Sequence, residues 1–196
     1  MKSWIKTYLR EGLDEMRIKP KQPYDSGSYH NIYWTQKNPN VLYKVGSREM
    51  VSEWVKVFQE YPQFFPKVYK VGRLPKNSDY YYVEIEKLDA PRAVNEWQKL
   101  YSNFLDLGIF SGPLKKKNVY SLERYFDYIH KDAEYEKQIS LVIKQQKPEI
   151  YDMYRRWTDL ILQLEVITQF ELNKYADVHG RNFAYDSHGN LKSIDI

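Results

Sequence analysis

Residues 175–196 read YADVHGRNFAYDSHGNLKSIDI, and the spacing of their polar side chains indicates both a fold and a chemistry. Asp177 precedes Asn182 by five positions, and Asp195 follows Asn182 by thirteen. Between Asn182 and Asp195 the turn sequence SHGN separates two short β-type segments, which predicts a hairpin. A polar loop followed by a hairpin that ends in a carboxylate can bring two oxygen ligands to one hard cation. Asp177 then remains available to meet a substrate hydroxyl.

Length and composition limit the classes of protein to consider. The 196 residues suffice for one domain or for two small lobes with a buried core. The net charge of +4 is a mild basic balance that does not by itself indicate nucleic acid binding. There is no cysteine, which excludes disulfides and thiolate metal sites. No run approaches the roughly 18 apolar residues of a membrane span, and the first residues lack a signal-peptide core, so we expect a soluble, cytoplasmic protein.

The hydrophobic pattern changes near residue 90. Residues 1–90 contain short β-branched and aromatic segments joined by turn residues, which predict a five-stranded sheet and one helix. A leading helix is expected over residues 3–18, where apolar side chains recur at helical spacing at Trp4, Tyr8, Leu9 and Leu13. Residues 91–196 predict a helical part, followed by the polar loop and the terminal hairpin. Strands first and helices second indicate an α+β fold with two lobes.

The loop DVHGRN resembles the catalytic loop of the protein kinase and aminoglycoside phosphotransferase superfamily. In that superfamily a catalytic Asp lies five positions before an Asn, and the metal-binding Asp of the Asp-Phe-Gly element lies at the end of the following hairpin. His179 makes the loop similar to the Asp-x-His-x-x-Asn form of small-molecule phosphotransferases and of small phage serine/threonine kinases. The resemblance implies a minimal bilobal kinase-like fold, with a β-rich N-lobe carrying one helix and a reduced helical C-lobe.

The resemblance also implies a role for each polar residue of the expected site. Asp177 is expected to orient and deprotonate the acceptor hydroxyl, and Asn182 and Asp195 are expected to hold Mg²⁺. Lys44, in the strand sequence VLYK, matches the lysine that holds the α and β phosphates of ATP. Glu53, on the inward side of the next helix, is the expected ion-pair partner of Lys44.

The nucleotide-binding residues implied by the resemblance lie in the first lobe. The segment DSGSYHNIYW resembles a glycine-rich loop in which Asp25 and His30 stand in the places of two glycines. Leu42 replaces the small residue that normally leaves space for adenine. The segment VEIEKLDAP resembles the last strand of the first lobe and the hinge after it, where the backbone of Glu86 to Leu88 would meet the adenine edge. The residues expected to bind the nucleotide are Gly27, Ser28, Ile32, Lys44, Glu53, Glu86 and Leu88.

Two functions from different classes remain open on the sequence. The first is an ATP-dependent phosphotransferase, which we expect to be a small phage-type serine/threonine kinase that acts on a protein and serves host takeover. The second is a kinase-like binding module that captures and inhibits a host protein without turnover. A third, nucleic acid binding through Lys115, Lys116 and Lys117, is not favoured because the basic residues are scattered.

Overall fold

The computed structural model describes most of the chain in six ranges, which are residues 23–26, 31–34, 39–74, 79–112, 119–172 and 178–195. The chain divides into two compact units, Met1–Leu88 and Asp89–Ile196. The leading helix predicted over residues 3–18 lies outside the described residues.

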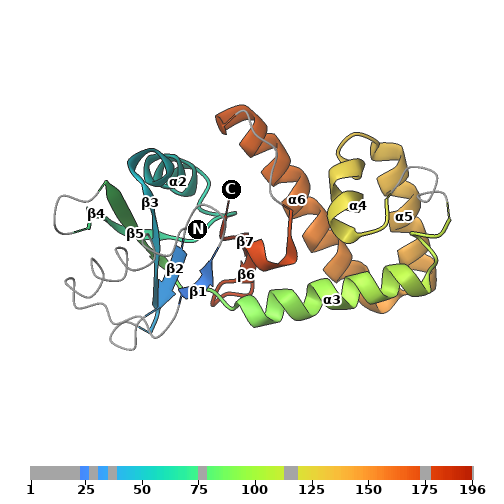
Figure 1. Ribbon diagram of the computed structural model, residues 1–196. Coiled ribbons are helices and arrows are strands. Elements are labelled where there is room, and N and C mark those ends of the chain that lie inside the picture. Colours follow the sequence, from blue (N-terminus) through green and yellow to red (C-terminus); the bar gives the residue numbers. More distant parts are fainter. Residues whose placement is uncertain are drawn as a thin grey trace. The chain divides into compact units, whose positions relative to one another are not determined.

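The first unit contains an antiparallel five-stranded sheet with the strand order β1-β2-β3-β5-β4. Its strands are β1 (Pro23–Ser26), β2 (Asn31–Trp34), β3 (Val41–Ser47), β4 (Val68–Arg73) and β5 (Tyr80–Glu86). Together with the helical second unit, this sheet confirms the predicted α+β fold class (Figure 1).

One face of the sheet packs against α2 (Arg48–Glu60). Ser47 begins this helix, because its hydroxyl accepts a hydrogen bond from the Met50 N–H at 3.3 Å. Trp54 then reaches back across β3, and a Cβ added at Gly46 would lie 2.7 Å from the indole Cη2. Glycine at position 46 therefore allows the helix to approach the strand closely. Lys44, Gly46 and the helix residues above them define what we call the α2 face of the sheet.

The opposite face carries a buried cluster of aromatic and aliphatic side chains. We call it the tyrosine face, and its buried members are Tyr33, Tyr43, Val45, Leu74 and Tyr82. Strand register explains the grouping, because Tyr33 lies opposite Tyr43 and Val45 lies opposite Tyr82. The rings of Tyr43 and Tyr82 lie 6.2 Å apart, centroid to centroid. Gly72 lies opposite Tyr82 on β4, and an added Cβ there would collide with the Tyr82 ring at 2.5 Å.

The second unit is mainly helical. Its helices are α3 (Ala90–Asp106), α4 (Leu122–Ile129), α5 (Ala133–Gln146), the short 3₁₀ helix η2 (Pro148–Ile150) and α6 (Tyr151–Leu172). Asp89, Ser121 and Asp132 cap the starts of α3, α4 and α5 with side-chain oxygens that accept backbone N–H groups. In the ranges that the structure describes, none of the helices has the length and apolar character to cross a membrane.

Candidate functional site

The end of the chain forms the predicted hairpin. β6 (Phe183–Tyr185) pairs with β7 (Leu191–Ser193) in antiparallel register. Gly189 closes the turn with a φ of +82°, a conformation in which a side chain is strained. The turn sequence SHGN therefore determines the local fold, as the sequence indicated.

Asp186 holds this turn closed from the inside. Its Oδ1 accepts hydrogen bonds from the backbone N–H groups of His188 at 2.9 Å and Asn190 at 2.8 Å. Its Oδ2 accepts a hydrogen bond from Asn190 Nδ2 at 3.0 Å and lies 3.5 Å from Lys192 Nζ. Burial raises the pKa of the Asp186 carboxyl, but these hydrogen bonds and the Lys192 charge outweigh it and lower the pKa below its ordinary value. Asp186 is therefore a structural carboxylate.

Asn182 and Asp195 lie together at the open end of the hairpin. The Asn182 carbonyl accepts a hydrogen bond from the Ile194 N–H at 2.8 Å, which extends the ladder one step beyond β6 and β7. Asp195 is the next residue, and its carbonyl accepts a hydrogen bond from the Ser193 hydroxyl at 2.5 Å. Both side chains are partly exposed. The backbone thus places an amide side chain and a carboxylate at the end of the hairpin opposite its turn.

A tight 3₁₀ turn, η3 (Gly180–Asn182), leads into this end of the hairpin. The exposed His179 ring caps it, since Nδ1 accepts the Arg181 N–H at 3.2 Å, and the Asn182 N–H donates to the His179 carbonyl at 2.8 Å. His179 therefore braces the loop.

Gly180 fits η3 onto a tryptophan of α3. A Cβ at position 180 would lie 2.5 Å from Trp97 Cγ. The Trp97 indole is itself held by Trp157 at 5.0 Å and by the Phe183 ring at 6.5 Å, centroid to centroid. The hydrophobic core of the second unit therefore positions the polar loop directly.

Glu96 of α3 is a charged residue that the sequence reasoning did not single out. Its Oε2 accepts hydrogen bonds from the Tyr185 hydroxyl and from Trp157 Nε1, the latter at 3.2 Å. Its Oε1 lies 3.7 Å from Arg92 Nε and 3.6 Å from an Arg156 guanidinium nitrogen. The pKa of Tyr185 is raised to about 12, mainly by burial and secondly by the hydrogen bond to Glu96. Glu96 thus joins α3, α6 and the hairpin.

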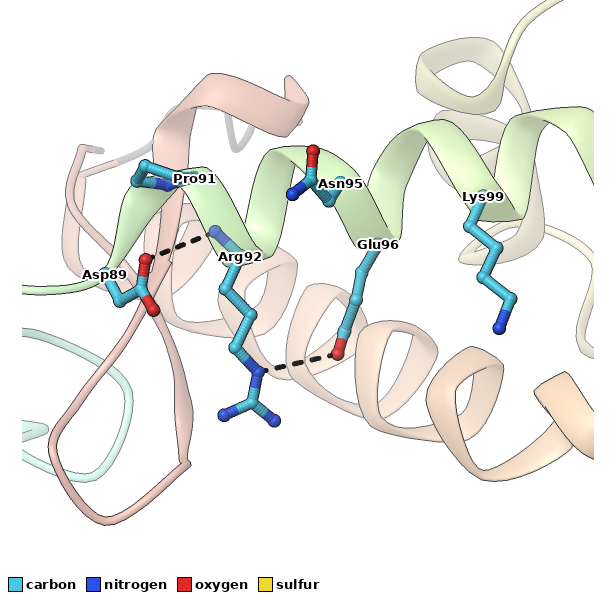
Figure 2. A pocket seen from close by; sticks show the side chains of 6 residues that line it. All are labelled: Asp89, Pro91, Arg92, Asn95, Glu96 and Lys99. Atoms are coloured by element: carbon cyan, nitrogen blue, oxygen red, sulfur yellow. Dashed lines mark hydrogen bonds and ion pairs between the residues drawn. The ribbon is translucent and has the colours of Figure 1, made fainter.

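The start of α3 also lines a pocket of about 520 Å³ (Figure 2). Its lining residues are Asp89, Pro91, Arg92, Asn95, Glu96 and Lys99. Figure 2 shows the side chains of Arg92, Glu96 and Lys99 on one side of the helix. The Arg92 guanidinium also lies 3.8 Å from the centroid of the Tyr185 ring. Acidic and basic side chains are both present, so the pocket has no strong preference for ligands of one charge.

In the first unit, Lys44 is fully buried on the α2 face. It lies opposite Ile32 on β2 and opposite Val83 on β5. Its ammonium lies 4.2 Å from the centroid of a Trp54 ring and 5.7 Å from that of Phe58. The aromatic contacts offset part of the cost of burying the charge. Glu53, on the turn of α2 next to Trp54, is half-buried, and its pairing with Lys44 stays a prediction.

The expected hinge follows β5. The Glu86 N–H donates to the Lys67 carbonyl at 2.9 Å, and the Lys87 N–H donates to the Asn40 carbonyl at 3.0 Å. Two of the three hinge amides are therefore used within the unit. The amide of Leu88, whose side chain is buried, makes no hydrogen bond to another described residue.

Several predicted residues lie outside the described ranges. They are Gly27, Ser28, Asp177 and the lysines at 115–117. Across the described residues, no three His, Cys, Asp or Glu side chains gather as a metal site. Asn182 and Asp195, the two residues predicted to hold Mg²⁺, both lie within the described ranges.

Comparison with known proteins gives only distant structural likeness. No family model and none of the curated proteins matches the chain. Among solved structures, a mutant aminoglycoside 2'-phosphotransferase-IIIa with GDP is 11% identical, with 97% of this chain and 70% of that chain covered and a TM-score of 0.35. The gentamicin complex of APH(2")-IIa is 16% identical, with 100% and 69% covered and a TM-score of 0.31. The GDP and kanamycin complex of APH(2")-IIIa is 12% identical, with 100% and 72% covered and a TM-score of 0.34.

Proposed function

We propose that the protein is an ATP-dependent phosphotransferase. The observation that carries this proposal is the hairpin end, where the Asn182 to Ile194 backbone hydrogen bond brings Asn182 and Asp195 to one end of a short ladder. An amide oxygen and a carboxylate are hard oxygen donors, which suit Mg²⁺. Bound there, Mg²⁺ would neutralise charge on the phosphates of ATP. Asn182 and Asp195 are the residues that would hold it.

The remaining roles follow from the resemblance stated above. Asp177, which comes five residues before Asn182, would accept the proton of the acceptor hydroxyl and orient its oxygen toward the γ-phosphorus. The oxygen forms a bond to phosphorus as the bond to the ADP oxygen breaks, and ADP leaves with its electron pair. In the first unit, Lys44 would hold the α and β phosphates, and the Leu88 amide would meet the adenine edge.

We propose a protein hydroxyl as the acceptor, as in a small phage-type serine/threonine kinase. This part of the proposal rests on the resemblance to small phage kinases and on the short helical part, in which α3 to α6 span residues 90–172. Two of the neighbouring structures named above contain an aminoglycoside, gentamicin in one and kanamycin in the other. An aminoglycoside acceptor is therefore the alternative that the assay must include.

A specific observation favours a second candidate, the kinase-like binding module without turnover. Lys44 is fully buried against Trp54 and Phe58, and Leu42, on the same face of β3, is also buried. A lysine in this setting must leave its aromatic contacts before it can meet a phosphate. If Lys44 stays in contact with Trp54 and Phe58, the protein would keep the fold and bind a partner without transferring phosphate.

Calorimetric titration with ATP, with and without Mg²⁺, separates the two candidates. A phosphotransferase must bind Mg²⁺ and ATP together, and binding to the native state also raises the thermal midpoint by mass action. The acceptor is then tested with ATP labelled on the γ-phosphate and three classes of acceptor, which are a mixed Ser/Thr peptide library, whole bacterial protein and aminoglycosides. No binding at millimolar Mg²⁺ and ATP would exclude the enzyme. Binding without transfer to any acceptor would favour the binding module.

A further inference from the structure

The start of α3 holds Tyr185 of β6 through both the backbone and the side chain of that tyrosine. The Asp89 N–H donates to the Tyr185 carbonyl at 2.7 Å, and the Tyr185 N–H donates to the Asp89 carbonyl at 3.1 Å. The Tyr185 hydroxyl donates to Glu96 Oε2, and the Arg92 guanidinium lies over the ring. Figure 2 shows Asp89, Arg92 and Glu96 along this part of the helix. One tyrosine of the hairpin is thus held by three residues of one short stretch of chain.

Glu96 can fix the Tyr185 hydroxyl because other partners determine its own position. Trp157 Nε1 of α6 donates to the same carboxylate oxygen at 3.2 Å, and an Arg156 guanidinium nitrogen lies 3.6 Å from the other oxygen. The Glu96 side chain is 17% exposed, so water screens these interactions only in part. A carboxylate that is tied to α6 cannot follow the tyrosine if the hairpin moves. The hydroxyl is therefore bound to a fixed point of the helical unit.

The hairpin carries this constraint to the two residues expected to hold Mg²⁺. β6 and β7 pair at all three positions, so they form one ladder. Asn182 lies three positions before Tyr185, which is about 10 Å along an extended strand. Asp195 lies two positions after β7, and the Ile194 N–H to Asn182 carbonyl bond of 2.8 Å closes this end. A shift of β6 against α3 would therefore displace both expected oxygen ligands together.

Two separate contacts with α3 determine the direction of the hairpin as well as its position. The first is the close approach of Gly180 to Trp97 beside the end that carries Asn182. The second is the bond from the Tyr185 hydroxyl to Glu96, at the other end of β6. With the first contact alone, the hairpin could rotate about that point. The second contact removes this freedom.

We propose that Tyr185 and Glu96 are positioning residues, whose hydrogen bond sets the placement of Asn182 and Asp195 relative to α3. Both residues act through the hairpin and not by touching the metal or the nucleotide. The effect on the hairpin follows from the geometry alone, whereas the consequence for Mg²⁺ rests on the proposed function. Loss of the hydroxyl should weaken the Mg²⁺-dependent part of ATP binding and leave the Mg²⁺-independent part unchanged.

Tyr185→Phe tests the proposal because it removes the hydroxyl and keeps the ring under the Arg92 guanidinium. Tyr125→Phe is the matched control, since the Tyr125 hydroxyl lies 2.7 Å from the Tyr154 hydroxyl in a contact between α4 and α6. Each variant loses one tyrosine hydrogen bond in the same unit, so a general loss of stability would affect both. A double variant, Tyr185→Phe with Glu96→Ala, tests whether the hydroxyl acts through the carboxylate.

Two measurements are made on each variant. Hydrogen exchange of the Ile194 amide, followed by NMR, reports the hairpin end without any ligand. Calorimetric titration with ATP, with and without Mg²⁺, reports the metal site. Tyr185→Phe should speed exchange of the Ile194 amide about tenfold and weaken ATP binding about tenfold when Mg²⁺ is present. A tenfold change corresponds to about 1.4 kcal/mol, which is close to the contribution of a hydrogen bond to a charged group. Tyr125→Phe should change neither quantity.

The exchange rate of the Ile194 amide decides the effect on the hairpin. An unchanged rate in Tyr185→Phe overturns the proposal, and so does an equal increase in Tyr125→Phe. Tyr185→Phe should add nothing in the Glu96→Ala background, and a further tenfold increase there overturns the role of the carboxylate.

The titrations separate this proposal from the proposed function. If the unsubstituted protein binds Mg²⁺ and ATP but Tyr185→Phe binds them equally well, the positioning role is overturned. If the unsubstituted protein does not bind them, the proposed function fails. Faster exchange of the Ile194 amide in Tyr185→Phe alone would then still support the placement of the hairpin by Glu96.

Discussion

Gly180→Ala tests whether the core of the second unit positions the polar loop. The added methyl group would lie 2.5 Å from Trp97 Cγ, which is about 1.0–1.5 Å inside a normal carbon contact of about 3.5–4.0 Å. The indole cannot simply move away, because Trp157 lies 5.0 Å and Phe126 5.6 Å from it, centroid to centroid. Overpacking of a well-filled core costs about 1–3 kcal/mol. We expect that loss in the free energy of unfolding of the second unit, together with weaker Mg²⁺-dependent binding of ATP, because η3 must shift.

Urea unfolding followed by tryptophan fluorescence measures the first effect, and titration with Mg²⁺ and ATP measures the second. The double variant Gly180→Ala with Trp97→Leu provides the control. Removing the indole creates space, so the two substitutions should be less harmful together than the sum of their separate costs. The reasoning is refuted if Gly180→Ala changes the free energy of unfolding by less than about 0.5 kcal/mol, the range of ordinary surface substitutions. It is also refuted if the two costs simply add.

Three further predictions follow from individual side chains. Asp177→Asn should leave ATP binding nearly intact and slow phosphoryl transfer by roughly 10² or more, whereas Asp195→Ala should abolish the Mg²⁺-dependent part of binding; identical behaviour in calorimetry and transfer assays contradicts the separate roles. Glu96→Ala should cost about 1–3 kcal/mol in urea unfolding because it leaves buried donors unpaired, and Glu96→Gln, which keeps an acceptor, should cost less. The pKa of Asp186 is lowered in the fold, so its contribution to stability is present above the unfolded value of about 3.9 and is lost as the pH falls through the folded value. In Asp186→Asn the free energy of unfolding should therefore fall less steeply as the pH is lowered through the acid range. The same fall in the variant as in the unsubstituted protein contradicts this.

Local sequence signals predicted most of the secondary structure. The helix predicted to follow the strand VLYK and to carry Glu53 is α2, and the turn SHGN lies between β6 and β7 as expected. These features depend on residues only a few positions apart, so periodicity and turn chemistry carry the information. The burial of the tyrosine face was not predicted, because alternation along a strand gives two faces but does not say what covers each one.

The network around Glu96 could not be predicted because its partners are far apart in the sequence. The hydrogen bond from Trp157 spans 61 positions, and the one from Tyr185 spans 89. Nothing in the sequence around Glu96 distinguishes it from an ordinary solvent-exposed acid on a helix. The contact of Gly180 with Trp97 is equally distant, although the glycine in DVHGRN offered a signal for close approach.

The aromatic surroundings of Lys44 bear on its expected role as a phosphate ligand. The centroid of a Trp54 ring on α2 lies 4.2 Å from its ammonium. A desolvated cation–π contact is worth about 2 kcal/mol. Charge-assisted hydrogen bonds to phosphate are about twice as strong as neutral ones, so phosphate can compete with the ring for the ammonium. The burial of Lys44 is therefore compatible with nucleotide binding, provided that the phosphates replace the aromatic contact. What distinguishes an enzyme from a binding module in this chain is whether that exchange occurs when Mg²⁺ and ATP are present.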